Sequence, residues 1–195
     1  RELRLNCCKI VAEACRDLIS SRSVTQTQKQ AKKTATSKLR GKMAKALTKA
    51  SNDSIPNRNA ISSKMGLLMS QLLLDDEEIV CTACRAVAAA CLKHEANLNA
   101  VTSALDSALI PLLGHPSREV VLASLRALAT LLKNHQRNKE AAQSAVRRVA
   151  PLLNKDSSVE MLQLASLTLS ELVQDCVTNK DALSETDFDR LVMLL

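Results

Sequence analysis

Three cysteines and a histidine in the middle of the chain have the spacing of a metal site. Cys81, Cys84, Cys91 and His94 spell C-x2-C-x6-C-x2-H, and thiolate sulfur and imidazole nitrogen are ligands that zinc prefers. In one continuous helix, however, ten residues advance ~15 Å, whereas zinc ligands lie only ~2.0–2.3 Å from the ion. Cys81, Cys84 and Cys91 instead share one helical stripe with Ala88, as core positions do. We therefore predict packing positions, no metal and no cofactor.

Catalytic patterns are weak throughout the chain. None of the three histidines stands in a recognisable nucleophile–base pattern. The three glycines are isolated from one another, so no glycine-rich phosphate loop is present. These residues are His94, His115 and His135, with Gly41, Gly66 and Gly114. We expect a protein that is not an enzyme and that takes no small-molecule substrate.

The net charge of +7 is concentrated in one segment. No acidic residue occurs between Asp17 and Asp53, while the nine cations of residues 22–49 leave 7 − 9 = −2 for the rest of the chain. A solvated loop is the simpler explanation of such a segment. The alternative is that it binds a polyanion, either nucleic acid, an acidic protein tail or an acidic lipid surface. No aromatic residue there can stack on bases. The cations are Arg22, Lys29, Lys32, Lys33, Lys38, Arg40, Lys42, Lys45 and Lys49.

The seven cysteines point to a reducing compartment. They are odd in number and fall inside apolar helical patterns, as reduced and buried cysteines do. No apolar run approaches the ~18 residues of a membrane span, and no leader pattern opens the chain. We expect a cytoplasmic or nuclear protein without a membrane span.

The elements that must position these residues are helices. The chain has no Trp or Tyr, one Phe, three Gly and four Pro, which suits helices and not hairpins. Apolar residues recur at helical spacing over residues 2–20, weakly over 36–50, and then over about 61–73, 79–91, 97–113, 118–133, 138–153 and 158–176. Pro111 and Pro151 should kink the helices that contain them. Residues 51–59 read as a turn cluster.

A period near forty repeats along the chain. Asn97, Asn138 and Asn179 recur at one constant interval, and each is followed by an alanine at the third position after it. Such a period in helical patterns is typical of a stacked-helix array. We predict irregular N-terminal helices over 1–59, with a basic loop at about 21–36. Three repeats and a partial fourth follow, at about 60–96, 97–137, 138–178 and 179–195.

Residues 60–195 resemble the armadillo/HEAT superfamily of helical repeats, most clearly over 109–141 and 149–182 and more loosely over 75–100. The resemblance implies an all-α, right-handed α-solenoid whose inner helices line an extended protein-binding groove. Peptide-gripping armadillo arrays carry an inner row of Trp and Asn. The Trp positions here hold Arg85, Arg126 and Leu167, so peptide clamping of that kind is not implied. The Asn positions of that row hold Ala89, Thr130 and Glu171, and Val121 replaces the Arg of the HEAT signature.

The second helix of each repeat carries the candidate protein-binding face. Arg85 and Arg126 recur at the period of the repeat, on the side opposite Leu125, Leu128 and Leu132. Packed helices lie ~8–10 Å apart and an extended ligand advances ~3.3 Å per residue. The two arginines are thus spaced to contact groups about three residues apart on a bound segment, although an ordinary polar face explains them equally. The candidate residues are Glu78, Thr82, Arg85, Glu119, Arg126, Thr130 and Lys133. We predict a non-catalytic scaffold for protein partners, with polyanion binding through residues 22–49 as the alternative.

Overall fold

The computed structural model describes residues 41–42, 44–51 and 55–193. All of them belong to one compact unit, Gly41–Leu195. The predicted helix over 2–20 and the predicted loop at about 21–36 lie outside the described residues.

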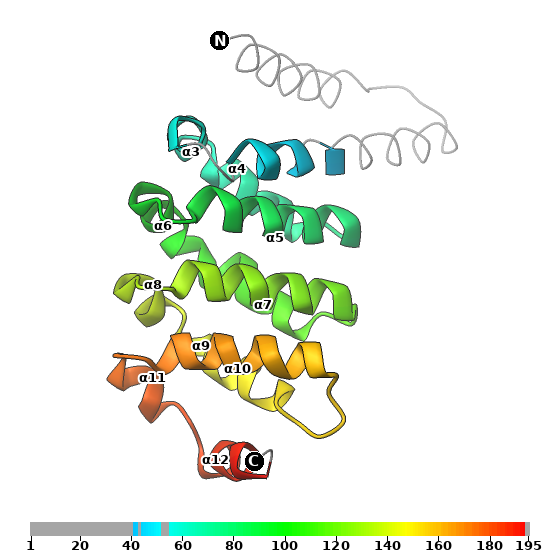
Figure 1. The fold of residues 1–195 in the computed structure, drawn as a ribbon, viewed down its shortest axis with the longest axis vertical. Coiled ribbons are helices and arrows are strands. Elements are labelled where there is room, and N and C mark those ends of the chain that lie inside the picture. The colour runs from blue at the N-terminus through cyan, green and yellow to red at the C-terminus, as the bar shows by residue number, and fades with distance from the viewer. Residues whose placement is uncertain (1–40, 43, 52–54, 194–195) are drawn as a thin grey trace, which may run out of the picture. The chain divides into compact units, whose positions relative to one another are not determined.

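Three long helices form the spine of this unit. They are α5 (Glu77–Cys91), α7 (Arg118–Leu132) and α10 (Val159–Val173). Figure 1 shows them as successive layers, and α7 packs against α5 on one side and α10 on the other. They coincide with the second helices predicted for the three repeats.

The first half of each repeat is broken into short helical pieces rather than one helix. Before α5 these are α3 (Ile55–Ser62), α4 (Met65–Ser70) and η1 (Gln71–Leu73). Before α7 they are α6 (Glu95–Val101), η2 (Thr102–Ala104), the π-helical η3 (Leu105–Leu109) and η4 (Ile110–Gly114). Before α10 they are α8 (Gln136–Ala141), α9 (Gln143–Val149) and η5 (Ala150–Leu152). The chain then continues through α11 (Val177–Asp181) and α12 (Glu185–Val192).

At the two prolines predicted to kink their helices, the structure departs from α-helical geometry. Pro111 lies in η4 and Pro151 in η5, both 3-10 turns, because proline removes one hydrogen bond of an α-helix and its ring clashes with the preceding turn. The predicted turn at 51–59 is wrong for its second half. Helix α3 begins at Ile55, where Pro56 stands in the first turn, a position that tolerates a missing N–H.

The core is built from Leu, Val, Ala and Cys side chains between the layers. Cys84, Leu125 and Leu128 are each 0% exposed, as the helical stripe predicted. Alanines on α5, among them Ala83 and Ala90, are also fully buried, so neighbouring helices approach closely. Burial of apolar surface between successive layers is therefore what holds the array together.

A residue in the left-handed conformation follows each long helix. Lys93, Asn134 and Asp175 have φ of 53°, 56° and 57°, and they recur at the same interval as the asparagines of the repeat. A left-handed residue after the helix end turns the chain sharply. The repeat therefore has a fixed backbone turn as well as a fixed apolar pattern.

A buried asparagine follows each of these turns and ties it to the helix before it. The side-chain Nδ2 of Asn97, Asn138 and Asn179 donates to the oxygens of Ala90, Leu131 and Leu172, at 2.7, 2.9 and 2.8 Å. Asn57 makes the same bond to the Ala50 oxygen at 2.8 Å, and it precedes Asn97 by close to one period. The repeat's hydrogen-bond pattern thus extends N-terminal to Ala60, where the sequence predicts the array to start. The individual repeat boundaries stay a prediction.

The predicted all-α solenoid is confirmed for the described residues, none of which forms a strand. No described helix is both long and apolar enough to cross a membrane.

Candidate functional site

The candidate site lies on the exposed side of the three long helices. We call it the second-helix face and define it by Glu78 and Arg85 on α5, Glu119 and Arg126 on α7, and Glu160 on α10. All five side chains are exposed. The apolar sides of these helices pack into the core, which leaves their polar sides exposed as this face.

Two columns of opposite charge run along this face. Glu78, Glu119 and Glu160 recur at the period of the repeat, each in the first turn of its helix. Lys45, Arg85 and Arg126 form the second column at nearly the same period. Each cation precedes the glutamate of the next layer by nearly the same interval, so the pattern offers three inter-layer ion pairs, which we call rungs.

The two outer rungs are closed and the middle one is open. Lys45 Nζ lies 3.0 Å from Glu78 Oε1, and the Arg126 guanidinium contacts Glu160 Oε1. Arg85 and Glu119 make no hydrogen bond or ion pair with any described residue. Exposed ion pairs contribute only ~0–1 kcal/mol each, so the rungs matter for the charge of the face more than for its stability.

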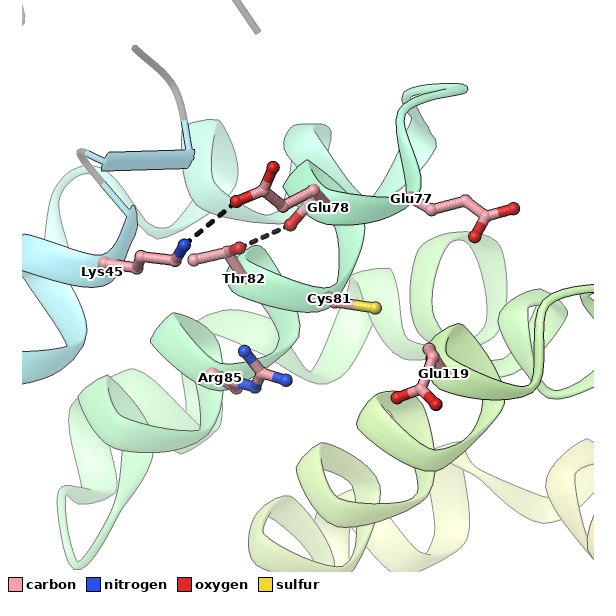
Figure 2. Close-up of a pocket in the computed structure, with 7 residues that line it drawn as sticks. All are labelled: Lys45, Glu77, Glu78, Cys81, Thr82, Arg85 and Glu119. Atoms are coloured by element: carbon pink, nitrogen blue, oxygen red, sulfur yellow. Dashed lines mark hydrogen bonds and ion pairs between the residues drawn. The ribbon is translucent and has the colours of Figure 1, made fainter. Parts of the chain in front are cut away.

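A surface depression of about 360 Å³ occupies the open rung. Figure 2 shows Arg85 on α5 and Glu119 on α7 on opposite sides of it, with the sulfur of Cys81 directed from α5 toward α7. It is lined by Lys45, Glu77, Glu78, Cys81, Thr82, Arg85 and Glu119. The depression therefore combines an uncharged floor with charged walls from α5, from α7 and, through Lys45, from the helical stretch that precedes α3.

The floor of the depression is electrically neutral. Cys81 is 8% exposed, and burial raises the pKa of its thiol, with the nearby Glu119 and Glu77 carboxylates adding to the rise and Arg85 opposing it. The Thr82 hydroxyl donates to the Glu78 backbone oxygen. At neutral pH the charge of the depression is thus set by its walls.

Two of the predicted face residues lie elsewhere than expected. Thr82 is 1% exposed, so the prediction of an accessible side chain there is wrong; its hydroxyl is used by its own helix turn. Thr130 is half-buried and bonds to the Arg126 backbone oxygen at 2.9 Å. Lys133 is exposed at the C-terminal end of α7.

The two arginines predicted to act as an equivalent pair differ. Arg126 is engaged by Glu160, whereas no described residue engages Arg85, which is therefore able to contact a ligand. The sequence showed their common period but not that Arg126 alone is paired, because its partner belongs to another layer.

The cysteine–histidine pattern is a packing pattern in the structure. Cys84 and Cys91 are fully buried in α5, and burial raises the pKa of each thiol to about 12. His94 precedes α6, where its Nδ1 accepts from the Asn97 N–H at 3.3 Å and its Nε2 lies 2.6 Å from Asn59 Oδ1. Among the described residues no group of three or more His, Cys, Asp or Glu side chains is placed to hold a metal.

Of the predicted polyanion-binding residues, three lie in the described part of the chain. Lys42, Lys45 and Lys49 are exposed on the helical stretch that precedes α3, and Lys45 is paired with Glu78. The others, Arg22, Lys29, Lys32, Lys33, Lys38 and Arg40, lie outside it.

Sequence reasoning missed Lys45 and Glu160 as members of the two charged columns, although for Lys45 a signal was present. Asn57 is followed by Ala60 just as Asn97 is followed by Ala100, which places Lys45 one period before Arg85. The basic composition of residues 22–49 obscured this register.

The sequence matches no protein-family model and no curated protein. Its fold does match solved structures. An engineered protein of the Northeast Structural Genomics Consortium matches with a TM-score of 0.71 at 23% identity, covering 82% of this chain and 66% of that one. A second engineered protein of the same consortium matches with a TM-score of 0.68 at 20% identity, covering 80% and 68%.

A designed armadillo repeat protein, solved in complex with the peptide (KR)4, also matches. Its TM-score is 0.63 at 17% identity, with 77% of this chain and 72% of that chain covered. Together with the stacked layers and the repeating turn, these likenesses show that the chain has an armadillo-like helical-repeat fold.

Proposed function

We propose that this protein is a non-catalytic scaffold that binds an extended protein segment along the second-helix face. The observation that carries the proposal is the column arrangement: successive layers place chemically matched side chains at a fixed period on one exposed surface. An extended chain presents its own groups at a fixed rise of ~3.3 Å per residue. A periodic surface of this kind is therefore suited to contact several residues of one segment.

The fold class supports the same proposal. One structural neighbour, a designed armadillo repeat protein, holds a peptide, so the fold accommodates such a ligand. The middle of the second-helix face offers a depression with an arginine and a glutamate that no described residue engages. Their hydrogen-bonding groups fit the oxygens and N–H groups of a peptide main chain. An intracellular location is part of the proposal, because the described cysteines Cys81, Cys84, Cys91 and Cys176 are free and buried.

A peptide selection tests this function. A display library of random twelve-residue peptides would be selected on the purified chain, and the recovered peptides would be synthesised with a fluorophore for anisotropy titration. We expect saturable binding that is weakened at least about fivefold by the double substitution Arg85→Ala/Glu119→Ala, because two exposed polar contacts are lost.

The chain offers a matched control on a different surface. Arg137 and Glu140 are an exposed arginine and glutamate on α8, and Arg137→Ala/Glu140→Ala removes the same charges. We expect that variant to bind as the unsubstituted chain does. Failure to recover any peptide, or equal loss in both double variants, would contradict the proposed function.

A further inference from the structure

We propose that the chain has a second binding surface, a basic edge that holds the phosphate backbone of a nucleic-acid duplex. The basic edge is defined by Arg118, Arg147, Arg148 and Lys155, and all four side chains are exposed. It is separate from residues 22–49, where the sequence predicts polyanion binding. It also does not depend on the proposed binding of a peptide to the second-helix face.

The sequence contains a second basic stretch besides residues 22–49. Residues 133–155 carry six cations and one acid, Glu140, a net charge of +5 that leaves 7 − 9 − 5 = −7 for the remaining chain. Lys139 is buried and donates to the Gln174 oxygen at 2.9 Å, but the other five cations are exposed. Positive charge is thus concentrated around α8 and α9, in a part of the chain that is otherwise acidic.

Two contacts bring cations to neighbouring turns of the array. Figure 1 shows the turns that precede α7 and α10 on the same side of the stack. Arg148 on α9 reaches the first turn, because its Nη1 lies 3.4 Å from the point where a Cβ at Gly114 would stand. Arg118, at the start of α7, donates to Ser158 Oγ at the end of the second turn, and Lys155 lies within that turn. The cations therefore lie along one edge where two layers meet.

The charges of this edge are not neutralised by the described part of the chain. The side chains of Arg147, Arg148 and Lys155 make no hydrogen bond or ion pair with a described residue. The partner of Arg118 is an uncharged hydroxyl. The repeat does not require these cations either, since the position one period before Arg147 holds Asp106. Their charge is available to a ligand.

The surroundings of the edge favour a nucleic acid over a protein segment. Protein partners are held mainly by buried aromatic and apolar anchors. In the two turns, residues 114–117 and 154–158, Asp156 is the one acid, and Val159 is the one large apolar side chain exposed next to them along the chain. Interfaces with nucleic acid are instead polar and strongly positive.

The types of side chain indicate contact with the backbone of a duplex. Three of the four cations are arginines, whose planar guanidinium groups donate two parallel hydrogen bonds to a phosphate. Stacking on the bases of a single strand requires aromatic side chains, but the chain has no Trp or Tyr and its one Phe, Phe188, lies on α12. Contacts to phosphate alone position a duplex without reading its sequence.

A fluorescent DNA duplex of about 20 base pairs is the probe, titrated by anisotropy at several salt concentrations. The unsubstituted chain is compared with one whose six cations between residues 22 and 40 are replaced by glutamine, so that binding through that segment is removed. In both backgrounds we expect Arg147→Gln/Arg148→Gln to weaken binding at least about fivefold at 100 mM salt. The slope of log K against log salt should fall in magnitude by about two, because two phosphate contacts are lost.

Lys133→Gln/Arg137→Gln is the matched control. It removes two exposed charges of the same basic stretch at the other end of α7, where the rise of the helix places them ~20 Å from Arg118. Since this exceeds the ~10 Å Debye length at 0.1 M salt, we expect less than an about twofold change in affinity. Equal weakening by both double variants would overturn the inference in favour of a general charge effect.

Two further outcomes would also overturn it. One is the absence of saturable duplex binding once the six cations between residues 22 and 40 are replaced. The other is displacement of the duplex by a polyglutamate peptide at the same concentration of charge, which would identify a surface for acidic protein segments. Binding of a library-selected peptide is a separate readout that Arg147→Gln/Arg148→Gln should leave unchanged, so the basic edge and the proposed function can each fail without the other.

Discussion

At the scale of single residues, the buried asparagines stabilise the fold through side-chain hydrogen bonds that join separate segments. Asn138 is 0% exposed; its Nδ2 donates to the Leu131 oxygen at 2.9 Å and its Oδ1 accepts from Thr102 Oγ1 at 2.6 Å. Removing the amide takes the Nδ2 donor from the Leu131 oxygen in a buried site, whereas the Thr102 hydroxyl keeps its bond to the Leu98 oxygen at 3.2 Å; one orphaned buried group costs about 1–3 kcal/mol.

We therefore expect Asn138→Ala to lower the free energy of unfolding by about 1–3 kcal/mol. Asn99→Ala is the control, because Asn99 is exposed and its side chain donates to the exposed Glu95 at 3.3 Å. Urea denaturation measures both. Equal stability of the two variants would show that the buried amide is not a structural tie.

Asn179 lacks one of the bonds that its counterparts make. Its Oδ1 is buried without a hydrogen-bond partner, whereas the Oδ1 of Asn97 accepts from Ser62 and that of Asn138 from Thr102. The equivalent donor position is Gln143, which follows Asn138 by the same interval as Thr102 follows Asn97. The glutamine side chain instead donates to the Thr178 oxygen at 3.3 Å.

Gln143→Thr should supply the missing hydroxyl and raise the free energy of unfolding by about 0.5–1.5 kcal/mol. Gln143→Val has nearly the same shape without the hydroxyl and should give no such gain. A valine variant as stable as the threonine variant would assign the effect to packing or helix propensity and not to Asn179.

At the scale of the element, the left-handed position after a long helix is occupied by residues that suit this conformation to different degrees. Asn134 suits its φ of 56°, but Lys93 adopts a φ of 53° that asparagine and glycine accept more readily than lysine. Lys93→Asn should raise the free energy of unfolding by about 0.5–1 kcal/mol. Lys133→Asn is the matched control, since Lys133 has a φ of −57° and gains nothing from a residue that tolerates the left-handed region. Thermal unfolding compares the two variants. The same gain in stability for Lys93→Asn and Lys133→Asn would contradict the explanation from backbone conformation.

Two buried thiols on α5 make the free energy of unfolding depend on pH in the alkaline range. Burial raises the pKa of Cys84 and Cys91 from 9.0 to about 12, so between pH 9 and pH 12 the native state holds protons that the unfolded chain releases. Their contribution is complete below pH 9 and is lost as the pH rises toward 12. Between pH 8 and pH 10 we expect these two thiols to lower the free energy of unfolding by roughly 2–3 kcal/mol.

The Cys84→Ala/Cys91→Ala variant isolates this effect from other groups that titrate in the same range. Urea denaturation at both pH values should show a smaller pH dependence in the variant than in the unsubstituted chain. The same pH dependence in both proteins would mean that the buried thiols do not contribute.

The helices and the core could be predicted from the sequence more completely than the candidate site. The constant period of Asn97, Asn138 and Asn179 and the stripe through Cys84 and Leu125 depend on local sequence, and they located the long helices closely. The pairing of Arg126 with Glu160 depends on contacts between layers. The periodicity of the sequence does not reveal which of the two exposed arginines is engaged, so the open rung became visible only in the structure.

At the scale of the whole molecule, two modes of binding differ in their response to salt. A polyanion held by six or more of the cations in residues 22–49 should lose ~10³-fold or more in affinity between 50 and 200 mM salt. A peptide held on the second-helix face uses few ion pairs and should lose less than about tenfold. Anisotropy titrations with a single-stranded oligonucleotide and with a library-selected peptide compare the two directly.

Removing residues 22–49 would not separate these modes. Lys45 pairs with Glu78, Ala44 is buried in the core and Leu47 packs against it, so that deletion also damages the array. Replacing the six cations at Arg22, Lys29, Lys32, Lys33, Lys38 and Arg40 by glutamine leaves those contacts intact. We expect this variant to retain peptide binding. Loss of peptide binding would indicate that the basic segment, and not the second-helix face, binds the peptide.

The most direct measurement is to locate a bound peptide by photo-crosslinking. A library-selected peptide carrying a diazirine at successive positions would be irradiated with the chain, and the modified residues identified by mass spectrometry. Our account predicts crosslinks on the exposed sides of α5, α7 and α10, with successive peptide positions reaching successive layers. Crosslinks confined to residues 1–40, or to α6, α8 and α9, would contradict it.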